Sequence, residues 1–191
     1  MKNNKQTIIF LFVIVAITTT VKVICAPQIN LSGFSAALAV ALFAGFAEKD
    51  AKKIFLLPLV ALFASDVLIQ LLYMAKLFPF AGFYQNQWIN YILIAALAGV
   101  GMLLRKGKLA GMLAASVLGP ALFFLISNYI VWVTQASIMG YSKDFNGLME
   151  CYRAGIPFYR NSVISTIIFL PAFATLYQWI VKGKFALQTA G

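Results

Sequence analysis

The sequence contains no histidine and only five acidic residues among its 191 positions. Charged residues make up 10% of the chain and hydrophobic residues 62%, whereas roughly a quarter of the residues of an ordinary soluble domain are charged. These shortages exclude a water-soluble globular protein. The chain also lacks a Gly-x-x-x-x-Gly-Lys-Ser/Thr motif, so any ATP hydrolysis that it uses must come from separate subunits.

The missing residue types also argue against an enzyme. A membrane enzyme needs a nucleophile with its base, or a metal cluster. The sequence offers one acid inside a predicted span, Asp66, and two isolated cysteines, Cys25 and Cys151. We therefore predict no enzymatic activity, no cofactor and no metal site. The cysteines leave three interpretations open: a disulfide, a soft metal ligand, or two unpaired thiols.

Long apolar runs are what the chain has in abundance. A run of about 17 to 25 apolar residues is long enough to cross the hydrocarbon core as a helix. Because Ile24 stands where a signal-peptide cleavage site needs a small residue, the first run is expected to stay in the mature protein. The sequence predicts an all-α membrane helix bundle, one domain over residues 1–191, with six spans at about 8–25, 31–47, 54–77, 88–104, 109–133 and 162–181.

The basic residues indicate how the bundle is oriented. The net charge is +10, and most of the basic residues lie in the two tails and in the loops after the second and fourth spans; Lys182 and Lys184 are in the C-terminal tail. By the positive-inside rule, both termini are cytoplasmic in a multi-pass protein of the inner (cytoplasmic) membrane. The basic excess reflects topology, so we expect the lipid bilayer, and no nucleic acid, as a partner.

Polar residues within the spans gather in the outer half of the predicted bundle. Asp66 lies about 18 Å and Lys22 about 22 Å from the cytoplasmic ends of their spans. These similar depths are compatible with a structural ion pair, with Lys22 reaching toward the headgroups, or with a proton relay. The candidate substrate-binding residues of the outer side are Asp66, Gln70, Asn90, Asn128, Trp132, Tyr152 and Arg160.

The segment 134–161 is much longer than a simple helix connection, and a connection of this length is typical of a functional or folded loop. Its middle suits a short interfacial helix that ends before Pro157. We interpret the segment as a lid over the outer mouth of the bundle.

Small residues recur every four positions in the second predicted span. Gly33, Ala37, Ala41 and Gly45 form a smooth ridge of the kind that lets membrane helices pack closely. The ridge serves either to pack the chain's own bundle or to dock another membrane subunit.

Three stretches carry a resemblance to a known family: residues 123–132, 147–152 and 156–161. They resemble those of an uncharacterised family of bacterial six-helix membrane proteins to which transport is ascribed. The layout is also more distantly similar to the substrate-capturing S components of energy-coupling-factor (ECF) vitamin transporters. The chain departs from the family where a Gly-Asp pair is expected after Asn161 and where a His is expected after the third span.

These observations favour a membrane transport protein that captures a small molecule from the outer side. The resemblance implies a vitamin or cofactor precursor as substrate, and an ECF-type coupling subunit with its ATPases as partners. The alternative is a non-catalytic scaffold or assembly subunit, which would use the ridge but has no need of a polar outer pocket.

Overall fold

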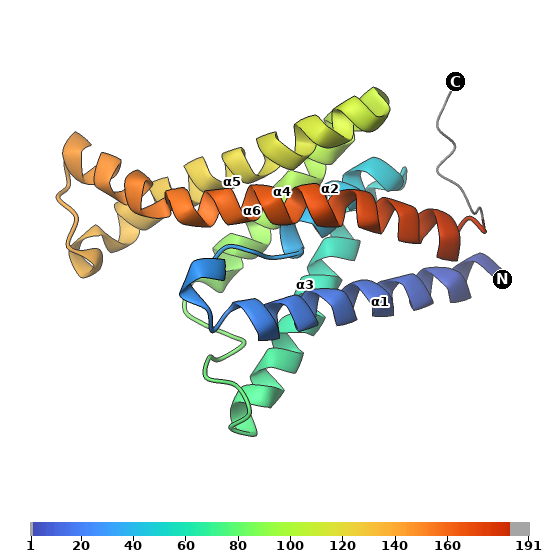
Figure 1. Ribbon diagram of the computed structural model, residues 1–191, viewed down its shortest axis with the longest axis horizontal. Helices are drawn as coiled ribbons and strands as arrows, with labels where there is room; N and C mark the ends of the chain where they lie inside the picture. Colours follow the sequence, from blue (N-terminus) through green and yellow to red (C-terminus); the bar gives the residue numbers. More distant parts are fainter. Residues whose placement is uncertain (1, 184–191) are drawn as a thin grey trace.

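The chain folds into six α-helices and two short 3-10 helices within residues 2–183, the part that the computed structural model describes (Figure 1). The all-α prediction is confirmed, and Lys184 lies outside the described residues. The elements, in chain order, are α1 (Lys2–Cys25), η1 (Ile29–Leu31), α2 (Ala37–Ala47), α3 (Ala51–Met74), α4 (Gln87–Leu104), η2 (Arg105–Gly107), α5 (Lys108–Met139) and α6 (Phe145–Ile180).

Every α-helix except α2 is long and apolar enough to cross a membrane. The predicted span 31–47 is wrong in its first six residues, because α2 begins only at Ala37. With 11 residues, α2 is about 16 Å long, well short of the hydrocarbon core. Gly33, at φ +85°, has a left-handed backbone that interrupts a right-handed helix, and the carbonyls of the preceding turn bond to α6 instead.

The short helix α2 lies at the centre of the bundle. Residues 37–45 are all buried, and α2 packs against α3, α4 and α6. Near its C-terminal end Phe43 meets Phe10 of α1 and Tyr177 of α6, with ring centroids 5.3–5.4 Å apart in edge-on pairs. One end of the bundle therefore holds the beginning of α1, the end of α2 and the end of α6. We call it the basic end.

The opposite end of the bundle, which we call the pocket end, holds the connections 26–36, 75–86 and 140–144. In Figure 1 the end of α3 and the α5–α6 turn point away from each other on this side, and the segment 26–36 runs between them. The helices are therefore spread apart at the pocket end, where connecting segments fill the space.

The ridge of small residues is used inside the molecule. Ala41 is fully buried, and a Cβ added to Gly45 would lie 2.1 Å from the carbonyl oxygen of Ala98 in α4. Gly101 of α4 approaches α2 in the same way, since its Cβ would lie 2.2 Å from the oxygen of Leu42. The docking interpretation of Gly33, Ala37, Ala41 and Gly45 is therefore wrong: the helical part of the ridge packs α2 against α4.

The predicted lid loop 134–161 is also wrong, because the two helices continue through most of it. α5 runs to Met139 and α6 begins at Phe145, so only residues 140–144 form the connection. Asp144 caps α6 by accepting a hydrogen bond from the Gly147 amide, and Pro157 stands within the helix. At 36 residues, α6 is about 54 Å long, so it extends well beyond the hydrocarbon core.

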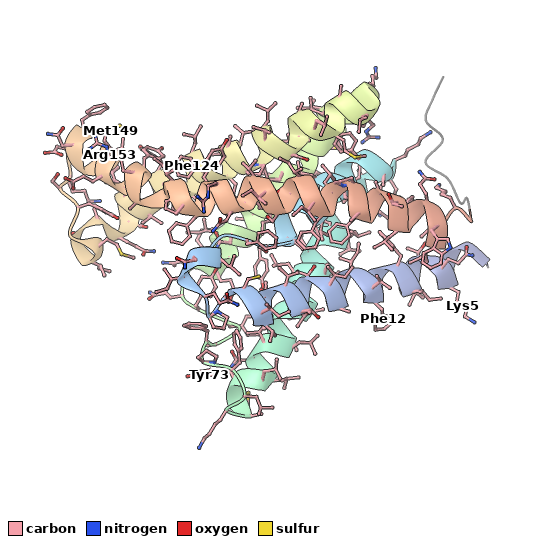
Figure 2. All side chains as sticks on the ribbon, viewed as in Figure 1. Lys5, Phe12, Tyr73, Phe124, Met149 and Arg153 are labelled. Carbon is pink, nitrogen blue, oxygen red and sulfur yellow. The ribbon has the colours of Figure 1, made fainter. Side chains whose placement is uncertain are left out.

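Large apolar side chains cover the outside of the bundle. Phe12 of α1 is 72% exposed and Leu103 of α4 is 83% exposed, and Figure 2 shows Phe12 pointing away from the other helices. A water-soluble monomer rarely exposes apolar surface over so many helices. This exterior fits a lipid bilayer as the surrounding medium.

Candidate ligand-binding cavities

A buried carboxylate organises the pocket end. Asp66 of α3 is 4% exposed and pairs with the ammonium group of Lys22 on α1. Its second oxygen accepts hydrogen bonds from the Gln87 side-chain nitrogen and the Tyr91 hydroxyl of α4, both at 2.6 Å. One buried charge thus ties three helices together, and each of its oxygens has a donor, as a charge in a low-dielectric region requires.

The ion pair is one of the alternatives that the sequence left open for Lys22. Both residues lie in the second half of helices that run from the basic end toward the pocket end, so their similar depths bring them together. Because the ammonium group contacts Asp66, the structure has the ion pair and not a Lys22 side chain that reaches toward the headgroups.

The 75–86 connection is fixed to α3 and α4 by two glutamines. Gln70 accepts hydrogen bonds from the amides of Gly82 and Phe83 at 2.9 and 3.3 Å. Gln87 donates to the Gly82 carbonyl at 3.1 Å and accepts from the Tyr84 amide at 3.1 Å. A Cβ on Gly82 would lie 2.0 Å from the Asp66 carbonyl oxygen, so only glycine lets the connection pass this close to α3.

A cavity of about 530 Å³ lies between these elements and the 26–36 segment. Its volume is in the range of sites that hold small organic molecules. Aromatic rings and aliphatic side chains form much of its wall, and among residues 2–183 Lys22 and Asp66 are the only charged ones that line it. The polar residues of the lining are Lys22, Ser32, Ser35, Asp66, Tyr84, Gln87, Asn90 and Ser162.

Tyr84 lines this cavity from the connection between α3 and α4. Burial raises the pKa of its hydroxyl, and the nearby Asp66 charge acts in the same direction, while the hydrogen bond from Asn90 acts against them. The hydroxyl therefore stays protonated at neutral pH. It remains able to donate a hydrogen bond to a molecule in the cavity.

Two neighbouring residues of α6 hold the 26–36 segment in place. The Asn161 amide donates to the carbonyls of Asn30 and Ser32 at 2.9 and 2.8 Å, and the Ser162 hydroxyl donates to the Gly33 carbonyl at 2.9 Å. A Cβ on Gly33 would lie 2.5 Å from the Phe158 carbonyl oxygen. The segment therefore lies directly against α6 and forms a wall of the cavity.

A second cavity of about 450 Å³ lies between α5 and α6 on the other side of this wall. None of its lining residues is charged. Asn128, which lines it, donates to the Phe124 carbonyl of its own helix at 2.8 Å, and the Cys151 thiol donates to the Asn128 carbonyl at 3.4 Å. Gly33, Phe123 and Ser162 line both cavities, so the two are immediate neighbours.

The structure separates the predicted site residues into three groups. Asp66 and Asn90 line the first cavity, Gln70 holds the connection beside it, and Asn128 lines the second. Like Gln70, the other three residues line neither cavity: the Trp132 indole bonds to the Ser142 carbonyl, the Tyr152 hydroxyl bonds to the Leu125 carbonyl, and Arg160 is exposed on α6.

Sequence reasoning missed Tyr84 and Ser162 of the cavity lining, and also Gln87 and Asn161. Gln87 stands at the first position of α4, one helical turn before Tyr91, and this spacing on one face of the helix is a signal for its contact with Asp66. Asn161 has no such signal, because its partners are backbone carbonyls more than a hundred residues earlier in the chain. Lys22, treated as a partner of Asp66, also lines the first cavity.

The two cysteines are not bonded to each other. Cys25 and Cys151 are both buried free thiols, so the disulfide alternative is wrong. Within residues 2–183 no group of three or more His, Cys, Asp or Glu side chains is placed to hold a metal ion.

Comparison with known proteins supplies a family and no function. No curated protein and no solved structure matches the chain. One family model matches residues 1–188, nearly the full length. The chain therefore belongs to the family described as "Family of unknown function (DUF6580)".

Proposed function

We propose that this protein is a membrane transport protein that captures a small molecule from the outer side, in the cavity beside the Lys22–Asp66 pair. The observation that carries the proposal is that cavity of about 530 Å³, which joins an apolar wall to a few polar groups. This combination is typical of sites for small organic molecules.

The position of the ion pair supports the proposal. A charge inside the membrane costs at least about 2.5 kcal/mol, and such residues tend to mark substrate or ion pathways. Lys22 and Asp66 both reach the cavity surface, although a purely structural pair could be buried away from it. A bound molecule would meet donors from Lys22 and Tyr84 and the amide of Asn90.

A coupling partner of the ECF type, suggested by the resemblance to S components, belongs to the same proposal. Such a partner needs another docking face, because the ridge of α2 is buried against α4. The scaffold alternative is weakened for the same reason, since it relied on that ridge.

The test is identification of the molecule that copurifies with the protein. Protein is isolated in mild detergent and denatured, and the released molecules are analysed by mass spectrometry. Ala81→Phe fills the cavity from the 75–86 connection, and Ala75→Phe, on the same connection but outside both cavities, is its control. We expect a small molecule with the natural and the Ala75→Phe protein and its loss with Ala81→Phe. Equal recovery from all three would refute the proposal.

A further inference from the structure

The two cavities differ in chemistry and share a wall. The first contains a compensated pair of charges and several hydrogen-bonding side chains, whereas the second contains no charged residue. Gly33, Phe123 and Ser162 belong to both linings, so the two cavities meet at these three residues.

Two polar side chains of the second cavity already donate hydrogen bonds within α5. The Ser127 hydroxyl and the Asn128 amide both donate to the Phe124 carbonyl, at 3.4 and 2.8 Å. Around them are apolar groups, including the ring of Phe124, which packs on Tyr159 with centroids 5.2 Å apart. This cavity therefore suits hydrocarbon and offers few groups to recognise a polar one.

The charges of the first cavity narrow the choice of its occupant. Lys22 and Asp66 neutralise each other, and each other lining residue is uncharged. A ligand with a net charge would have to break this pair or remain unpaired in a low-dielectric site, which is costly. An uncharged group avoids this cost, because it can form hydrogen bonds with Tyr84, Asn90 and the serines of the lining without breaking the ion pair.

We infer that the two cavities form one site for an uncharged amphiphile, with its hydrogen-bonding head beside Lys22 and Asp66 and its hydrocarbon tail between α5 and α6. This inference rests on the proposed function and adds the class of the ligand. Phospholipids, whose headgroups carry charged groups, do not match this class of ligand. The tail crosses the shared wall at the Phe123 side chain, because at Gly33 the backbone of Phe158 lies directly against the glycine.

The inference is tested with two photoreactive dodecanols, one with a diazirine next to the hydroxyl and one with a diazirine at the far end of the chain. The full-length protein is placed in nanodiscs of phosphatidylethanolamine and phosphatidylglycerol and irradiated, and the labelled peptides are mapped. We expect the first probe to label the peptides 26–38 and 78–90. The second is expected to label 123–131 and 151–159.

A matched pair of variants tests whether the tail of the probe occupies the second cavity. Ala154→Phe fills the second cavity, and Ala172→Phe places the same ring on α6 outside both cavities. Ala154→Phe should reduce labelling by the tail probe about tenfold, as expected if about 1.4 kcal/mol of tail binding is lost. Ala172→Phe should leave it unchanged.

The outcomes distinguish this inference from the proposed function. If the head probe labels the first cavity while the tail probe labels only the outer helix faces, the amphiphile inference is overturned and the proposed function stands. If neither probe labels the first cavity and no small molecule copurifies with the natural protein, both fail. Equal labelling of the Ala154→Phe and Ala172→Phe proteins by the tail probe would also overturn the inference.

Discussion

Lys22 of α1 and Asp66 of α3 form an ion pair within two helices that are each long and apolar enough to cross a membrane. Lys22 is 22% and Asp66 6% exposed in its side chain, so both charges are largely removed from solvent. Gln87 and Tyr91 complete the shell of Asp66 from a third helix. The pair therefore joins helices while it forms part of the cavity wall.

Removal of one partner should cost more than removal of both. Asp66→Leu leaves the Lys22 charge buried without a partner and should lower the free energy of unfolding by about 3 kcal/mol. Lys22→Met with Asp66→Leu removes both charges and should recover most of that loss. Titration with sodium dodecyl sulfate, followed by circular dichroism, measures each variant. If the change in unfolding free energy of the double variant equalled the sum of the changes of the two single variants, a direct interaction between Lys22 and Asp66 would be contradicted.

The ion pair is a feature that can be predicted from the sequence. Depth along a helix follows from counting residues, so the proximity of Lys22 and Asp66 could be anticipated without a structure. Two of the six predicted spans, 54–77 and 88–104, also agree with α3 and α4 to within three residues at both ends, because apolar length is a property of the local sequence.

The errors arise where backbone groups find partners far along the chain. The turn around Gly33 replaces helical hydrogen bonds with bonds to Asn161 and Ser162, and no local pattern shows that exchange. The predicted long loop between α5 and α6 is wrong because charged and aromatic residues are typical of irregular loops and also of helix turns outside a hydrocarbon core. In α6 they occupy a helix that is longer than a hydrocarbon core is thick, and its first turns suit water and headgroups; Figure 2 shows Met149 and Arg153 near the N-terminal end of this helix.

The crossing of α2 and α4 should be sensitive to a single methyl group. A Cβ on Gly101 would lie 2.2 Å from the Leu42 oxygen, whereas at Gly99, in the same helix, the nearest atom is the flexible end of Met102 at 4.0 Å. Gly101→Ala should destabilise the protein by about 1 to 3 kcal/mol through overpacking. Gly99→Ala should be neutral or stabilise it by up to about 1 kcal/mol.

Detergent-unfolding free energies of the two glycine variants provide the measurement. Equal stability of the Gly99→Ala and Gly101→Ala proteins would show that α2 and α4 do not cross as closely as the backbone distances indicate.

The 26–36 segment should loosen when its bonds to α6 are removed. Asn161→Ala deletes both amide donors to the Asn30 and Ser32 carbonyls, each loss costing about 1 kcal/mol. Hydrogen exchange of residues 26–36, measured by mass spectrometry, should accelerate. Thr175→Ala is the matched control, because its hydroxyl bonds only to Pro171 within α6. Unchanged exchange of the segment in the Asn161→Ala protein would contradict its attachment to α6.

The α5–α6 turn should respond to pH through Asp144. Hydrogen bonds from the Ser142 hydroxyl and then from the Gly147 amide lower the pKa of this carboxyl. A lowered folded-state pKa means that the charged form stabilises the turn. Its contribution is present above the ordinary carboxyl pKa and is lost as pH falls through the lowered value.

Trp132 reports this change, because its indole bonds to the Ser142 carbonyl and Lys143 lies over its ring at 5.4 Å. In a protein that carries Trp88→Phe and Trp179→Phe, acidification should shift the remaining tryptophan emission as the cap is protonated. Asp144→Asn cannot titrate and should give no transition over the same range. A transition that persists in that variant would show that the response does not come from Asp144.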